Sequence, residues 1–221
     1  MTQHRYPDGD RAAVYRVIRE RRDMRHFRRG AIDPAVLRRL LEAAHLAPSV
    51  GYMQPWRFIR ITDPALRRAI HAQVRAECEA TAEACGSRAD EVRRLKLEGI
   101  LECGELLVAA LADGRENYVL GRRMLPEMDL CSVACAIQNL WLAARAEGLG
   151  MGWVSLFEPD ELARLLNLPE GARPVAVLCL GHVEAFYPEP LLETVGWDTR
   201  RAMDETVFEN GWGRPLDLPN P

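Results

Sequence analysis

Three arginines lie within five residues, at Arg21, Arg22 and Arg25 of the run RRDMRHF. Arginine forms paired hydrogen bonds with phosphate oxygens, so this spacing is typical of a phosphate-binding site. On composition alone, a solvated run of charges is the favoured interpretation. Asp23 lies inside the run, where its negative charge would repel a phosphate. The binding interpretation therefore requires Asp23 to face a different part of the ligand.

The sequence PSVGYMQPW, residues 48–56, contains a second group of candidate binding residues. Two prolines bracket a short loop, and Gly51 permits a close approach of another backbone or of a ligand. The Gln54 side chain and the loop backbone can hydrogen-bond a planar, polar heterocycle. An ordinary connection between a helix and a strand would have a similar composition.

Two weaker motifs follow later in the chain. In GLGMGWVS, residues 148–155, glycine occupies every second position, but no strand precedes the glycines and no helix follows them as a dinucleotide-binding fingerprint requires. We interpret these glycines as the end of a helix and the start of a strand. Near the C-terminus, Arg200 and Arg201 form another arginine pair in TRRAMDE.

No metal site is expected, because the five histidines are scattered and lack metal-ligand spacing. Six cysteines are spread along the chain without a dense framework, and we predict reduced thiols. Cys131 and Cys135 are four residues apart on one helix face, and we predict that both are buried structural thiols.

Composition sets the class of protein. The chain has 221 residues, of which 48% are hydrophobic and 28% charged, and the formal net charge is −3. This charge offers no electrostatic reason for a nucleic-acid partner. Apolar runs are far shorter than the roughly 20 residues of a membrane-spanning helix, and the N-terminus lacks the apolar stretch of a signal peptide. We predict a cytoplasmic protein with a single domain over residues 1–221 and no membrane contact.

Periodicity predicts the elements that must position these candidate residues. Apolar residues at helical spacing predict helices, and short apolar or alternating runs predict strands. The resulting fold class is α+β, with helices around a small mixed β-sheet. The helix at 10–22 is predicted to bury a stripe of Val14, Val17 and Ile18. The helix at 129–147 is apolar around most of its circumference and is therefore expected in a core or at a subunit interface. The main predicted helices cover residues 10–22, 34–47, 64–84 and 129–147, and the strands 56–61, 106–112, 150–157 and 173–186.

Two segments are expected to serve as appendages. Residues 85–126 are weakly patterned apart from the strand-like LLVAALA, and we predict a lid that excludes water from a bound ligand. Residues 188–221 are proline-rich with little periodicity, and we predict an extended arm that wraps a partner subunit.

Together the motifs resemble the FMN-dependent nitroreductase superfamily over roughly residues 10–210. The resemblance rests on their order: RRxxRxF, then PSxxxxQPW, then a buried helix ending in EGLG before a Gly-Trp strand, then a late RR before DE. Common members carry serine where this chain has Asp23, and asparagine where it has Tyr52. In these positions the chain is similar to members that fragment reduced FMN.

The resemblance implies an interlocked homodimer with flavin sites at the subunit interface and the 129–147 helix at its centre. Arg21, Arg22 and Arg25, helped by Arg200 and Arg201, would hold the phosphate and the polar flavin edge. Asp23 and Met24 would also lie against the flavin.

Ser49, Gly51 and Gln54 would reach the flavin from the partner subunit. Whether Tyr52 or Met53 touches it stays open.

The implied activity uses reduced FMN as a substrate. With O2, the isoalloxazine would become 5,6-dimethylbenzimidazole, the lower ligand of vitamin B12, and the ribityl chain would leave as erythrose 4-phosphate. NAD(P)H would act indirectly, through a separate flavin reductase. Asp23 is the candidate catalytic residue, as a proton relay, and Ser155 is the second candidate, through a hydrogen bond to the reacting flavin. The alternatives are an NAD(P)H-dependent nitroreductase or flavin reductase, and a flavin-binding protein without turnover.

Overall fold

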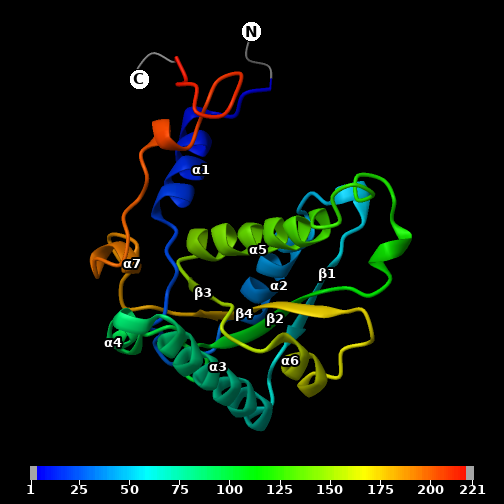
Figure 1. Ribbon diagram of the computed structural model, residues 1–221, viewed down its shortest axis with the longest axis vertical. Helices are drawn as coiled ribbons and strands as arrows, with labels where there is room; N and C mark the ends of the chain where they lie inside the picture. Colours follow the sequence, from blue (N-terminus) through cyan, green and yellow to red (C-terminus); the bar gives the residue numbers. More distant parts are fainter. Residues whose placement is uncertain (1–3, 218–221) are drawn as a thin grey trace. The chain divides into compact units, whose positions relative to one another are not determined.

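A four-stranded antiparallel sheet forms the centre of the fold in the computed structural model, which describes residues 4–217. The strands lie in the order β1-β2-β4-β3 (Figure 1). Both β2 and β4 are buried along almost their whole length. The strands are β1 (Trp56–Arg60), β2 (Glu105–Leu111), β3 (Gly150–Val154) and β4 (Arg173–Gly181).

The prediction of a mixed sheet is wrong, because each neighbouring pair of these strands is antiparallel. A helical connection such as that between β2 and β3 usually joins two parallel neighbours. Here β2 and β3 do run in the same direction, but β4 inserts between them and runs opposite to both. The four predicted strand positions themselves are confirmed.

Helices cover both faces of the sheet (Figure 1). On one face α2 (Pro34–His45) and α5 (Met128–Ala146) pack over strand residues such as Leu107 and Ala109. On the other face α3 (Pro64–Ala84) and α6 (Pro159–Leu165) pack over residues such as Leu106 and Val108. Each strand thus alternates between two cores, as the two-residue period of a strand requires.

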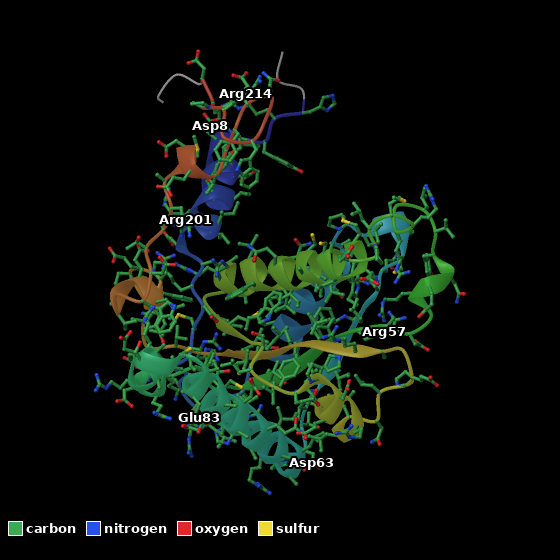
Figure 2. All side chains as sticks on the ribbon, in the orientation of Figure 1. Asp8, Arg57, Asp63, Glu83, Arg201 and Arg214 are labelled. Atoms are coloured by element: carbon green, nitrogen blue, oxygen red, sulfur yellow. The ribbon has the colours of Figure 1, made fainter. Side chains whose placement is uncertain are left out.

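Two aspartates begin helices as their sequence context predicts. Asp33 accepts a hydrogen bond from the Ala35 backbone at 2.8 Å, and Asp63 accepts one from Ala65 at 2.7 Å. A proline follows each aspartate at the first helical position. Figure 2 labels Asp63 and Glu83 toward opposite ends of α3.

The first helix, α1 (Asp8–Glu20), departs from its prediction. None of its residues is buried, and Val14, Tyr15 and Ile18 expose large apolar side chains. The predicted stripe is therefore not buried: Val14 and Ile18 are exposed, and Val17 is only half-buried.

The α5 helix buries one face and exposes the other. The buried face includes Val133, Ile137 and Leu140, whereas Cys131 and Cys135 are exposed. The prediction that these two cysteines are buried within the chain is wrong, since their shared face points away from the sheet. All six cysteines are free thiols.

The segment predicted as a lid contains several elements. Residues 105–111 form β2, a central strand, so only the parts on either side of it can move as a lid, and the lid itself stays a prediction. Before β2 lie a short 3-10 turn (Gly86–Arg88) and α4 (Ala89–Arg94). After β2 comes an excursion over residues 112–127 that contains a 3-10 turn (Arg115–Asn117).

The described chain divides into two compact units, the first ending at Phe186 and the second beginning at Tyr187. The second unit holds α7 (Leu191–Thr194) and a 3-10 turn (Met203–Glu205). Within it Phe208 stacks on Trp212 with ring centroids 5.4 Å apart. The predicted wrapping role of this segment stays a prediction.

Within the described residues, no helix is long and apolar enough to cross a membrane. The same part of the chain contains no group of three or more histidine, cysteine, aspartate or glutamate side chains placed to hold a metal ion.

Candidate active site

The arginine-rich segment runs alongside β3, the edge strand of the sheet. The Met24 backbone N–H donates to the Met151 carbonyl at 2.9 Å, and Asp23 forms a parallel bridge with Met151. Two β3 glycines allow this approach. A Cβ atom at Gly152 would lie 2.4 Å from the Met24 carbonyl oxygen, and one at Gly150 would lie 2.5 Å from a Val183 methyl.

The interpretation of the glycine motif is therefore incomplete. Gly148 does follow α5, with a φ of 75°, and Gly150 does begin β3. The further role of Gly150 and Gly152 is to make room for residues 23–24. Glycine at alternate positions of a strand leaves one face of it without side chains, and this signal was present in the sequence.

Asp23 and Arg25 both hydrogen-bond the backbone of Trp153, one at its N–H and the other at its carbonyl. Asp23 Oδ1 accepts a hydrogen bond from the Trp153 N–H at 3.0 Å, and Arg25 Nη2 donates to the Trp153 carbonyl at 2.7 Å. The same Arg25 nitrogen lies 2.5 Å from Asp23 Oδ2. Asp23 is therefore ion-paired, and one of its oxygens is aligned by a backbone donor.

The electrostatic setting of Asp23 raises the pKa of its carboxyl above the usual value of 3.8. Burial is the largest cause, because crowding by protein disfavours the charged form. Arg25, the Trp153 N–H and Arg21 act in the opposite direction. The side chain still exposes 42% of its surface, so solvent or a ligand can reach it.

Ser155 is exposed two residues beyond Trp153 and lines a cavity of about 540 Å³. Trp153 also lines this cavity, and its backbone N–H binds Asp23. The cavity and Asp23 therefore both contact the same residue. Arg173 adds a positive charge to the cavity wall. The apolar part of the wall includes Leu111, Leu130, Phe157 and Val175.

The three N-terminal arginines differ in their surroundings. The Arg21 guanidinium lies 4.5 Å from the centroid of the Trp141 ring, a cation–π contact. Arg22 Nη1 donates to the carbonyls of Arg19 and Arg21 at 2.7 and 2.9 Å. Arg25 is committed to Asp23 and Trp153, and its side chain is only 12% exposed. Each of the three arginines thus already makes at least one contact within the chain, and their predicted contact with a phosphate stays a prediction.

The 48–56 loop contains a 3-10 turn (Val50–Tyr52) with an unusual backbone. Gly51, Tyr52 and Gln54 all have positive φ, at 53°, 55° and 50°. For non-glycine residues this conformation costs on the order of 1–3 kcal/mol each, and such strain tends to cluster at functional sites. Ser49 stabilises the turn, because its Oγ accepts from the Gln54 N–H at 3.0 Å.

The segment that leads into Asp23 and the 48–56 loop contact opposite halves of α5. The Trp141 indole donates to the Arg22 carbonyl at 3.2 Å, whereas Ser132 Oγ accepts from the Val50 N–H at 3.0 Å. Trp141 lies nine positions after Ser132 on the helix, which is about 14 Å along the axis. Within one chain, the two groups of predicted site residues are thus held apart.

Arg200 and Arg201 belong to the second unit. Arg201 Nη1 lies 3.9 Å from the Glu205 carboxylate, which is also in that unit (Arg201 is labelled in Figure 2). Their predicted contact with a flavin phosphate stays a prediction.

Known proteins are similar to this chain over most of its length. The nitroreductase family model matches residues 18–182. The 5,6-dimethylbenzimidazole synthase of Rhodospirillum rubrum is 45% identical over 185 residues, covering 82% of this chain and 87% of that protein. The 5,6-dimethylbenzimidazole synthase of Rhodobacter capsulatus is 44% identical over 189 residues, covering 85% and 91%.

A similar solved structure is a putative nitroreductase from Desulfovibrio desulfuricans in complex with FMN. It has a TM-score of 0.65 and 24% identity, and the match covers 90% of this chain and 97% of that one. At this identity the likeness concerns the fold alone. From the family model and the sequence relatives, the chain belongs to the nitroreductase family, in the branch that contains the 5,6-dimethylbenzimidazole synthases.

Proposed function

We propose that this protein is a 5,6-dimethylbenzimidazole synthase that converts reduced FMN and O2 into 5,6-dimethylbenzimidazole and erythrose 4-phosphate. Two relatives that are 44–45% identical over 185–189 aligned residues are named 5,6-dimethylbenzimidazole synthases. The observation that carries the proposal is Asp23, an accessible carboxylate of raised pKa held against β3 next to the Ser155 cavity.

The residues around this cavity fit FMN. Its apolar and aromatic walls suit a flat aromatic ring, and the Ser155 hydroxyl suits a ring heteroatom. Arg21 and Arg22 supply cationic donors for a phosphate. The positive φ angles of the 49–54 loop direct its backbone groups into a fixed arrangement, as binding loops often require.

The roles of the chain's own residues follow from their contacts. Reduced FMN, when bound, supplies the electrons and the carbon skeleton of the product. Arg25 and the Trp153 N–H hold the Asp23 carboxylate in one orientation, so its oxygens can accept and return a proton. Ser155 supplies a hydroxyl that can donate or accept one hydrogen bond in the cavity that Trp153 also lines.

The functional form is a homodimer in which each flavin site combines two chains. Exposed apolar side chains support this arrangement, since a single soluble chain rarely leaves so many uncovered. They lie on α1, on the outer face of α5 and in the 112–127 excursion, and include Val14, Tyr15, Ile18, Val119, Leu120, Met124, Leu125 and Leu130. The separation of the 49–54 loop from Asp23 within one chain also supports a site completed by a partner. A cytoplasmic location remains a prediction.

The test is to incubate the purified protein with FMN, NAD(P)H and a separate flavin reductase in air, and to analyse the small molecules by mass spectrometry. We expect 5,6-dimethylbenzimidazole to rise as FMN disappears. Intact FMN together with NAD(P)H consumption by this protein alone would indicate a conventional nitroreductase. Bound, intact FMN without turnover would indicate a flavin-binding protein.

A further inference from the structure

The loop predicted to contact the flavin is packed against a segment about seventy residues further along the chain. A Cβ atom added at Gly51 would lie 2.6 Å from the Leu120 carbonyl oxygen, and one added at Gly121 would lie 2.8 Å from a Val50 methyl. The close approach that Gly51 permits is therefore to the 112–127 excursion. The excursion therefore packs closely against the turn that contains Gly51.

An ion-pair cluster fixes the excursion to the start of α5. The Asp129 carboxylate lies 2.9 Å from Arg115 Nε and 3.3 Å from Arg122 Nε. Its side chain is only 7% exposed, so the two guanidinium groups are its main source of compensating charge. Arg115 also donates to the Gly171 carbonyl at 2.8 Å and to the Ala112 carbonyl. Arg115 and Arg122, which flank Leu120 and Gly121 in the sequence, are thus both held by ion pairs to Asp129.

The same end of α5 binds the loop directly. Ser132 is buried, and its hydroxyl accepts from the Val50 N–H at 3.0 Å while donating to the Met128 carbonyl at 2.7 Å. Ser132 lies three residues after Asp129, so both face the same side of the helix. The first turns of α5 therefore bind the loop directly, through Ser132. They also bind the 112–127 excursion that packs on the loop, through the ion pairs of Asp129.

We propose that Asp129 and Ser132 are positioning residues for the flavin site, which hold the 49–54 loop in its left-handed conformation from two sides. This inference rests on the proposed function, because it assumes that the loop contacts FMN. Neither residue touches the Asp23 cluster in this chain, since Asp23 is bound by Arg25 and Trp153 near the other half of α5. Both act through the loop.

The first measurement is hydrogen–deuterium exchange of the peptide that covers residues 49–55, in protein without flavin. Ser132→Ala removes the acceptor of the Val50 N–H, and Arg122→Gln removes one tie of the excursion. We expect both variants to exchange faster in this peptide by about fivefold or more, the size expected for one lost buried hydrogen bond. Unchanged exchange in both variants would overturn the inference without reference to flavin.

Matched controls separate this effect from general destabilisation. Thr81→Ala removes a hydroxyl on α3, where Thr81 bonds Glu77 at 3.1 Å, and Arg38→Gln removes an exposed ion pair with Glu42 on α2. Neither control should change exchange at residues 49–55. If they change it as much as the test variants do, the loop simply follows global stability and the inference is wrong.

The second measurement is the affinity for oxidised FMN, from quenching of flavin fluorescence. We expect Ser132→Ala and Arg122→Gln to weaken binding about five- to tenfold, and Arg122→Lys to recover part of the loss because it keeps the charge. Faster loop exchange with unchanged FMN affinity would show that the loop is held but not for flavin. A wild-type protein that binds neither oxidised nor reduced FMN would instead refute the proposed function, and the inference with it.

Discussion

Asp23 Oδ1 accepts a hydrogen bond from the Trp153 backbone N–H at 3.0 Å, which joins the arginine-rich segment to the strand that leads to Ser155. Arg25 completes the arrangement from the Trp153 carbonyl. Asp23 is therefore bound two residues before Ser155 on the same strand segment, although the two candidate catalytic residues are 132 positions apart in the sequence.

Replacing the Asp23 carboxylate by an amide tests its proton-transfer role. Asp23→Asn keeps the size and one hydrogen-bond acceptor, so we expect FMN affinity to change by no more than about threefold. Formation of 5,6-dimethylbenzimidazole should fall about 100-fold or more, the usual effect of losing a general acid–base group. The measurement is product formation by mass spectrometry together with FMN titration.

The matched control is Glu79→Gln, another carboxylate that lies 2.5 Å from an arginine, here Arg93. It lies on α3, on the opposite face of the sheet from α5. We expect normal product formation in this variant. A full product yield from Asp23→Asn with FMN still bound would refute the role of Asp23.

The pH dependence of the reaction should report the raised pKa of Asp23. Only the ionised carboxylate can accept a proton, so activity should fall as pH decreases through a pKa above 3.8. The residual activity of Asp23→Asn should lack this acidic limb. The measurement is the initial rate of product formation against pH at saturating reduced FMN. An identical limb in the variant would assign it to another group.

Filling the space above Gly152 should displace residues 23–25 from β3. In Gly152→Ala the new methyl would meet the Met24 carbonyl oxygen at 2.4 Å, a backbone atom that cannot rotate away. We expect a loss of about 1–3 kcal/mol in the free energy of unfolding, and product formation should fall because Asp23 moves with the segment. Denaturant unfolding and the product assay measure the two effects.

Gly9→Ala is the corresponding control, because a Cβ there meets nothing within 4 Å and lies in α1. Alanine should be neutral or stabilising by up to about 1 kcal/mol in a helix. Equal unfolding free energies of Gly152→Ala and wild type would contradict the packing argument.

Mixing two inactive variants tests whether each flavin site uses two chains. Asp23→Asn disables one half of the site, and Gln54→Gly removes the loop side chain at a position where glycine suits the φ of 50°. Random pairing makes half of the dimers mixed, and each mixed dimer has one intact site. Remixing should therefore restore about a quarter of the wild-type activity in a symmetric dimer.

Light scattering after size-exclusion chromatography should give a dimer mass for each variant and for the mixture. Co-expression ensures exchange of chains if the purified dimers do not exchange. A dimer that regains no activity on mixing would place Asp23 and Gln54 in the same chain's site.

Much of the local structure could be predicted from the sequence. Helical spacing and aspartate–proline starts located α2 and α3, and apolar runs located all four strands, because these signals depend on residues within a few positions of one another. The order of four motifs also indicated the family. The same local signals could not show that α1 and the outer face of α5 lack cover within one chain, because burial depends on distant partners.

Strand order and the contacts of the site residues could not be predicted from the sequence, because they depend on residues far apart in the chain. The insertion of β4 between β2 and β3 made the sheet antiparallel, since strand order is set by which apolar faces can be buried together. Arg25 binds the carbonyl of Trp153, which lies 128 positions later in the sequence. Gly51 packs against Leu120, which lies 69 positions later. Local sequence patterns thus predicted the main helices, the strands and the family. The groups that orient Asp23 and those that hold the loop come together only in the folded chain. Hydrogen bonds and steric contacts act over a few ångströms in space, whatever the distance along the sequence.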